Sequence, residues 1–141
     1  RAKGVRRAVA NTLYSNAKEL FLNGDLDWAS HNIKCVLVDT EAYVPNFTTD
    51  EFLEDIPSGD RVATSANLGG KTSALGVADA NDVTFSTVIG DQSEALVIYR
   101  DVTDETDSPL IAYVDTATGL PVTPGGGNIT VEWNASGIFA L

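Results

Sequence analysis

Short β-prone runs recur along most of this chain and constrain its fold more than any other feature. Each run is rich in aliphatic and aromatic residues, and clusters of Gly, Asp, Asn, Ser or Pro separate it from the next. The runs are Ile33–Val38, Arg61–Leu68, Val83–Val88, Ala95–Tyr99, Leu110–Val114, Asn128–Trp133 and Gly137–Leu141. The run Ala95–Tyr99 is apolar throughout, which predicts a central strand. This spacing predicts a mainly β fold, an antiparallel β-sandwich or barrel of about seven or eight strands.

An N-terminal amphipathic helix is predicted ahead of these strands. Between Asn11 and Asn23, apolar residues recur at helical spacing, namely Leu13, Ala17, Leu20 and Phe21. Asn11 or Thr12 can cap the first turn, and Gly24 can end the helix.

The connection from Glu41 to Asp60 is long for a compact domain and contains Pro45. Within it, the residues Glu51–Ile56 follow a possible capping sequence and precede a Pro-Ser-Gly stop. The sequence therefore predicts one short helix inside a long loop.

Composition limits the chain to a few classes of protein. With 141 residues there is room for one core, so we expect residues 10–141 to form a single helix-plus-β-sandwich domain. The 20 acidic residues outnumber the nine basic ones, and the net charge of −11 disfavours direct binding to nucleic acid. A single cysteine excludes an internal disulfide. No apolar run approaches the roughly 20 residues that span a bilayer, and no signal segment opens the chain, so no membrane contact is expected.

Residues 1–9 form a basic arm that differs from the rest of the chain. Four of the nine basic residues lie here, namely Arg1, Lys3, Arg6 and Arg7. One interpretation is an arm that lies on an acidic neighbour, including another copy of the same chain. The alternative is that residues 1–8 lie upstream of the natural start, with Val9 encoded by a GTG start codon.

A catalytic, cofactor or metal site is not predicted. His31 is the single histidine, and Cys35 lies in an apolar run where a thiol is usually inert, although strand spacing allows the two side chains to share a face. The acidic clusters lack the spacing of a calcium loop, and solvated loops are the favoured interpretation. The segment Gly69–Thr72 resembles the end of a phosphate-binding loop, but Thr64 stands where that pattern begins with glycine. We interpret it as a hairpin turn with glycine at positive φ.

Several blocks of the sequence resemble a group of small structural proteins from the virions of tailed bacteriophages. The resemblance covers nearly all of residues 10–141. The blocks are Ala10–Tyr14, Ile33–Thr40, Tyr43–Pro45, Phe52–Pro57, Arg61–Ser65, Asp82–Ser86, Glu94–Tyr99, Leu110–Asp115, Val131–Trp133 and Gly137–Phe139. Members of this group typically begin with Met directly before the first block, so residues 1–8 depart from the pattern.

The resemblance implies assembly rather than enzymatic activity. The expected function is a capsid decoration or cement protein that binds the outer shell through contacts with the major capsid protein or neighbouring virion proteins, as a homo-oligomer or symmetric array. The alternative is a tail- or baseplate-associated structural protein, and a glycan or cell-wall hydrolase is less favoured. Such a protein would be assembled in the bacterial cytoplasm and reside in the virion.

The parts of the chain that a compact sandwich does not need for its own core are the candidates for partner contact. These are the N-terminal segment and the loop from Glu41 to Asp60. The contact residues predicted on this basis are Arg6, Arg7, Tyr43, Phe47 and Phe52.

Overall fold

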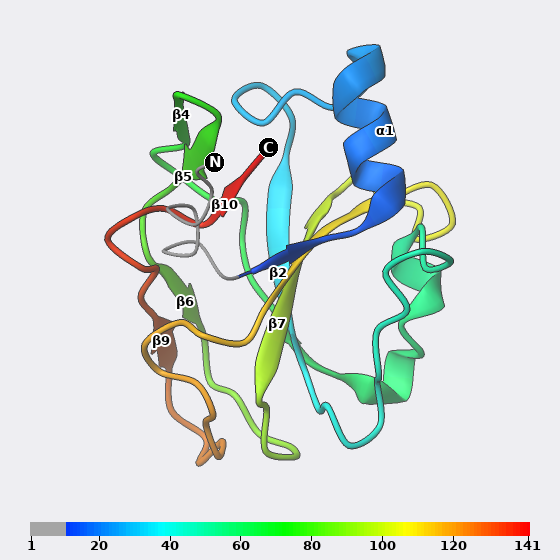
Figure 1. Cartoon of the computed structure of the whole chain (residues 1–141). Helices are drawn as coiled ribbons and strands as arrows, with labels where there is room; N and C mark the ends of the chain where they lie inside the picture. The colour runs from blue at the N-terminus through cyan, green and yellow to red at the C-terminus, as the bar shows by residue number, and fades with distance from the viewer. Residues whose placement is uncertain (1–10) are drawn as a thin grey trace.

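The fold is built on a five-stranded antiparallel sheet. A computed structural model describes residues 11–141, and this sheet has the order β1-β8-β7-β2-β3 (Figure 1). The strands are β1 (Thr12–Leu13), β8 (Leu110–Val114), β7 (Ala95–Arg100), β2 (Ile33–Val38) and β3 (Arg61–Thr64). The mainly β, antiparallel prediction is therefore confirmed.

The two longest strands, β2 and β7, form the middle of this sheet because both are almost wholly apolar. They pair in one unbroken register from Ile33 opposite Arg100 to Val38 opposite Ala95. Nearly every side chain of the pair is buried, which is the pattern of strands covered on both faces. The central position predicted for Ala95–Tyr99 is confirmed, since β7 lies between β8 and β2.

Two smaller sheets complete the β structure. The three-stranded sheet has the order β10-β5-β4, with β4 (Thr72–Ala74), β5 (Val77–Asp79) and β10 (Phe139–Ala140). The two-stranded sheet pairs β6 (Val83–Phe85) with β9 (Ile129–Val131). In Figure 1 these sheets lie to the left of β2 and β7, and β10 lies between the β4–β5 hairpin and α1.

The strands total ten within residues 11–141, and none of the three sheets closes into a barrel there. The five-stranded sheet ends in β1 on one side and β3 on the other, so the barrel alternative is wrong for the described chain.

The helix α1 (Ser15–Asn23) begins four residues later than predicted. Thr12 and Leu13 instead form β1, where they pair with Tyr113 and Ala112 of β8. Tertiary pairing at the sheet edge therefore overrides the helical spacing of Leu13. The end of the helix is as predicted, because Gly24 takes the left-handed conformation at φ 80° and its N–H bonds back to the last turn.

The segment from Glu41 to Asp60 contains two short 3-10 turns, Leu53–Asp55 and Ser58–Asp60, in place of the single short helix predicted. The Asp55 carboxylate accepts hydrogen bonds from the backbone N–H of Glu51 at 2.7 Å and of Phe52 at 3.0 Å. Ile56, the residue before Pro57, is extended at φ −97° and ψ 107°, and the first turn therefore ends after three residues. The Pro-Ser-Gly sequence expected to stop a helix leads into the second turn instead.

Across residues 11–141, no helix combines the length and the hydrophobicity that crossing a membrane would require.

Candidate interaction surface

The loop from Glu41 to Asp60 is fixed to the body of the protein by a buried chain of hydroxyl groups. The hydroxyl oxygens of Tyr14 and Tyr43 are 2.8 Å apart. The Tyr43 hydroxyl donates to the Asp50 carboxylate at 2.9 Å, and the same carboxylate accepts the N–H of Asn46. Burial raises the pKa of both tyrosines well above its usual range. The loop therefore turns around the Asp50 side chain and two neutral phenols.

Aromatic packing holds the next part of the loop. The Phe47 ring lies 5.2 Å from the Tyr14 ring and 5.8 Å from the Tyr113 ring, measured between centroids. The Phe47 carbonyl also accepts the N–H of Ser15 at 2.8 Å. These contacts tie the loop to the first turn of α1 and to β8, and such tilted aromatic pairs add to the stability gained from burial.

Arg61 holds the second half of the loop. Its guanidinium donates to the carbonyls of Ile56 at 2.8 Å and Leu53 at 3.0 Å. It also forms a two-pronged contact with the Glu105 carboxylate, with N–O distances of 3.2 and 3.3 Å. The N–H of Leu53 donates to the backbone carbonyl of Ser108 at 2.8 Å, so the loop is bonded to the 101–108 connection as well. A planar guanidinium suits this role because one side chain satisfies three partners.

The loop begins at an equally firm anchor. Glu94 accepts hydrogen bonds from both the N–H and the hydroxyl of Thr40, each at 3.0 Å. Beyond this anchor, Val44 projects outward with 77% of its surface exposed. A large aliphatic side chain is thus displayed on a backbone held in place on both sides.

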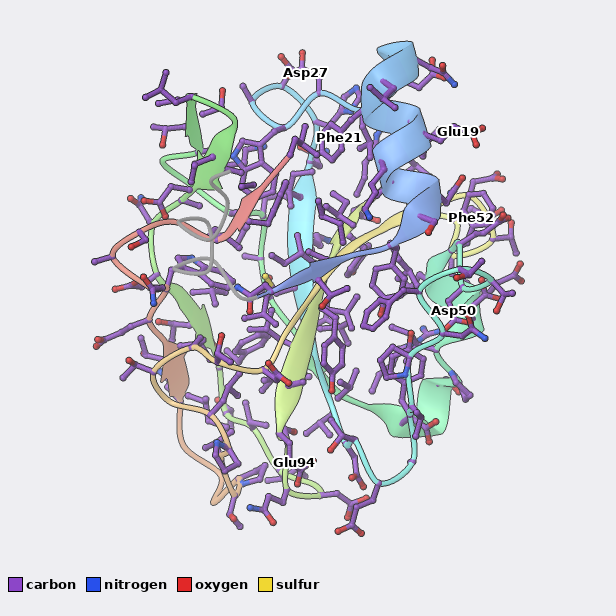
Figure 2. All side chains as sticks on the ribbon, viewed as in Figure 1. Glu19, Phe21, Asp27, Asp50, Phe52 and Glu94 are labelled. Atoms are coloured by element: carbon purple, nitrogen blue, oxygen red, sulfur yellow. The ribbon has the colours of Figure 1, made fainter. Side chains whose placement is uncertain are left out.

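The structure divides the predicted contact residues into three groups. Tyr43 is only 4% exposed, so its ring belongs to the core and offers a partner no surface, which corrects its prediction as a contact residue. Phe47 and Phe52 are half-buried, and Figure 2 shows Phe52 on the same side of the molecule as Asp50. Arg6 and Arg7, like the rest of the basic arm, lie outside the described residues.

A second apolar surface was not predicted from the sequence. A groove of about 570 Å³ lies between β1, α1 and the end of β10, and a smaller one of about 280 Å³ lies under the β4–β5 hairpin. Leu22, Leu75 and Leu141 stand exposed around the two grooves. The sequence signal that could have found this surface is Leu75 itself, a leucine directly before Gly76 at a turn position.

Cys35 lacks the environment of a nucleophile. Its side chain is fully buried in β2, and burial raises the pKa of the thiol well above its usual range. His31 lies ahead of the strand, where its Nδ1 accepts the backbone N–H of Asp27 at 3.0 Å. Burial lowers the pKa of this histidine. His31 thus serves as a neutral acceptor in a local turn.

Several acidic residues bond to nearby groups of the protein itself. Asp104 accepts bonds from the N–H and hydroxyl of Thr106, which lowers the pKa of the carboxyl. Asp101 pairs with Lys34 at 2.9 Å, which likewise lowers the pKa of Asp101. Within residues 11–141, no three His, Cys, Asp or Glu side chains come together as a potential metal site.

The glycines at positions 69 and 70 do not form a hairpin turn. Gly70 has the expected positive φ of 62°, but the segment is a connection that leads into β4. The hairpin turn lies further along, between Ala74 and Val77. Lys71 donates instead to the His31 carbonyl, a structural contact with its own chain.

No family model matches the sequence, and no curated protein matches it.

Proposed function

We propose that this chain is a non-enzymatic structural protein of a tailed bacteriophage virion, a decoration protein that binds the outer capsid shell. The resemblance of residues 10–141 to small virion proteins supports the class of function. The loop from Glu41 to Asp60 supports the mode of binding, because it is held rigidly by bonds at both ends while it exposes Val44. A surface ordered before binding loses little conformational entropy on contact.

We also propose that the three sheets form a β-sandwich. The five-stranded sheet would be one layer of a β-sandwich, with the two smaller sheets forming the other, and α1 would cover one edge of it. The buried residues of β6 and β9, Val83, Phe85 and Val131 among them, support this arrangement because they join the same core as β2 and β7.

In the proposed contact, Val44 and the exposed edges of Phe47 and Phe52 face the major capsid protein. Each single contact is small, and strength comes from repetition over the symmetric shell. The alternative proposal places the chain in the tail or baseplate. The same rigid loop would serve there, since a β fold of this kind does not by itself select a location.

The number of copies per virion separates these proposals. We expect quantitative mass spectrometry of purified virions to give a simple fixed ratio to the major capsid protein. A ratio near that of tail proteins would move the chain to the tail or baseplate. Complete absence from the virion would overturn both proposals and favour a search for hydrolase activity.

Binding of the purified chain to capsids that lack it tests the loop directly. Val44→Asp should weaken binding at least about tenfold, since it places a charge where an apolar side chain is buried on contact. Ile89→Asp is the matched control, because Ile89 is 74% exposed on a separate turn and should leave binding unchanged. Equal binding by the two variants would exclude the loop as the contact surface.

A further inference from the structure

The connection between α1 and β2, residues 24–32, gathers three basic side chains that the proposed capsid contact does not use. His31 belongs to this connection, Lys71 reaches it from the segment before β4, and Arg100 reaches it from the end of β7. The Lys71 ammonium donates to the backbone carbonyl of His31, and the Arg100 guanidinium lies 3.5 Å from the backbone carbonyl oxygen of Asp25. Three segments that are distant in the sequence therefore bring their basic groups to one loop.

The pairing of β2 with β7 explains why Arg100 lies beside this connection. Arg100 is opposite Ile33 in the register, and directly opposite residues of an antiparallel pair have their side chains on the same face of the sheet. The Asn32 carbonyl accepts the N–H of Asp101 at 2.9 Å, so bonding between the two segments continues one step beyond the strands. Arg100 is thereby held at the end of the sheet where the connection enters β2.

Arg100 has no carboxylate partner within residues 11–141, although the chain carries 20 acidic residues. The ion pairs of this part of the chain are Lys34 with Asp101 and Arg61 with Glu105. Arg100 is partly buried, and its contact with the Asp25 carbonyl is at the long limit of a hydrogen bond. A guanidinium has five N–H donors, so most donors of Arg100 are open to an acceptor from another molecule.

His31 adds a neutral donor to the same place. Its Nδ1 accepts the backbone N–H of Asp27 at 3.0 Å, so the proton of the neutral ring is on Nε2. No hydrogen bond within residues 11–141 uses this Nε2 N–H. Burial, and after it the positive charges of Arg100 and Lys71, lower the pKa of His31, whereas Asp27 acts in the opposite direction. Both cations therefore lie close to an imidazole that is neutral at pH 7.

The local charges favour a ligand with a single negative charge. Burial lowers the pKa of Lys71 and the negative charge of Asp27 opposes this shift, so Asp27 lies near Lys71 and balances it. Figure 2 shows Asp27 in the connection between α1 and β2. With His31 neutral, the charge of Arg100 remains uncompensated. A carboxylate matches this balance, and its two oxygens fit the parallel N–H donors of a planar guanidinium.

We propose that His31, Lys71 and Arg100 form a binding site for a single carboxylate group. The Arg100 guanidinium donates to the carboxylate oxygens, and the Nε2 N–H of His31 supplies a further donor. Lys71, held on the His31 carbonyl, adds positive charge beside them. The carboxylate belongs either to a small organic acid or to an acidic side chain of a partner protein, since both present the same group. The site does not depend on a place in the virion.

The single histidine of the chain makes the site directly observable by proton NMR, because the imidazole C–H signals come from His31 alone. Sodium acetate is titrated into the full chain at constant pH, with sodium chloride of the same ionic strength as the reference. We expect acetate to shift the His31 signals until they saturate. Acetate should also raise the pKa of His31, because a bound negative charge favours the imidazolium.

Two variants of Arg100 show whether the guanidinium holds the ligand. Arg100→Gln should weaken acetate binding at least about tenfold, and Arg100→Lys, which keeps the charge but not the paired donors, should weaken it less. Lys18→Gln is the matched control, since it removes one positive charge from an exposed position on α1 and should bind acetate as the native chain does. Urea unfolding of each variant confirms that it is folded.

Two further ligands complete the test. A glutamate-containing peptide with both ends blocked should bind more tightly than acetate if the natural ligand is a protein side chain, and no more tightly if it is a small acid. Inorganic phosphate should bind more weakly than acetate. The proposal is overturned if neither acetate nor the peptide gives a saturable shift, if Arg100→Gln binds acetate as the native chain does, or if phosphate binds more tightly than acetate.

Discussion

The phenolic oxygens of Tyr14 and Tyr43 lie 2.8 Å apart in the buried space between the start of α1 and the loop from Glu41 to Asp60. The Tyr43 hydroxyl in turn donates a hydrogen bond to the Asp50 carboxylate. Tyr43 thus connects Tyr14 in the core to Asp50, whose carboxylate also holds the backbone of the loop.

Replacing Tyr43 by Phe should destabilise the protein. The variant leaves the buried Tyr14 hydroxyl without its partner and removes one bond from Asp50, so we expect the free energy of unfolding to fall by about 1–3 kcal/mol. Urea unfolding followed by tryptophan fluorescence measures the change. Tyr113→Phe is the matched control, because the Tyr113 hydroxyl makes no hydrogen bond within the described part of the chain, and it should change stability much less. Equal losses in the two variants would contradict the structural role of the hydroxyl chain.

The tyrosines should resist ionisation in alkali as long as the protein is folded. The chain has four tyrosines, and burial raises the pKa of each, that of Tyr99 to about 12. The folded state therefore holds more protons than the unfolded state above the ordinary tyrosine pKa of about 10. Stability should be unaffected by these groups below that pH and should fall as the pH rises above it. Tyrosinate absorbance should appear together with unfolding, whereas in concentrated urea it should follow a simple titration near pH 10. Free titration of all four tyrosines in the folded protein would show that the phenols are accessible.

Arg61→Lys should loosen the second half of the loop. A lysine cannot bond the carbonyls of Ile56 and Leu53 while it pairs with Glu105, so we expect a loss of about 1–2 kcal/mol in the free energy of unfolding. Amide hydrogen exchange in the Arg61 variant should become faster in the loop from Glu41 to Asp60, while exchange in the rest of the protein should stay the same. Lys34→Gln is the control, since its single pair with Asp101 near the surface should contribute about 0–1 kcal/mol. Unchanged exchange in the Arg61 variant would show that the loop is held by other contacts.

Gly119→Ala should be among the most damaging small substitutions. Gly119 has φ 106°, and a Cβ atom there would lie 2.6 Å from the Thr130 carbonyl oxygen. Backbone strain and the steric clash together should cost at least about 2 kcal/mol of folding free energy. Gly125→Ala is the matched control, because a Cβ there meets nothing within 4 Å, and stability should change little. Thermal unfolding of the two variants provides the comparison.

The sequence predicted the central strands well because their apolar runs are continuous. The bounds of β2 and β8 match the predicted Ile33–Val38 and Leu110–Val114, and β7 extends one residue beyond the predicted run. Such runs are buried on both faces in almost any fold that contains them. The strands that went unpredicted have no such signal. The residues of β4 are all exposed, and its hairpin turn lacks the usual Asn-Gly pair.

The interaction surfaces were harder to predict because apolar residues in the core and on the surface look alike in sequence. Tyr43 was expected in a contact and lies in the core, whereas Leu22 follows Phe21 on the helix and lies in solvent. Leu20 and Phe21 pack against the core, and a rotation of one residue along the helix separates them from Leu22. Only the direction in which α1 docks on the sheet decides which leucine is exposed.

The pairing of β1 with β8 also determines when the protein can fold during its synthesis. The first of these strands leaves the ribosome about a hundred residues before its partner, and β2 likewise waits for β7. Pairings between such distant segments form slowly, and the apolar β2 segment remains uncovered in the meantime. The growing chain therefore depends on keeping apart from its neighbours until β7 and β8 have emerged, and an acidic chain that repels other copies of itself is suited to that interval.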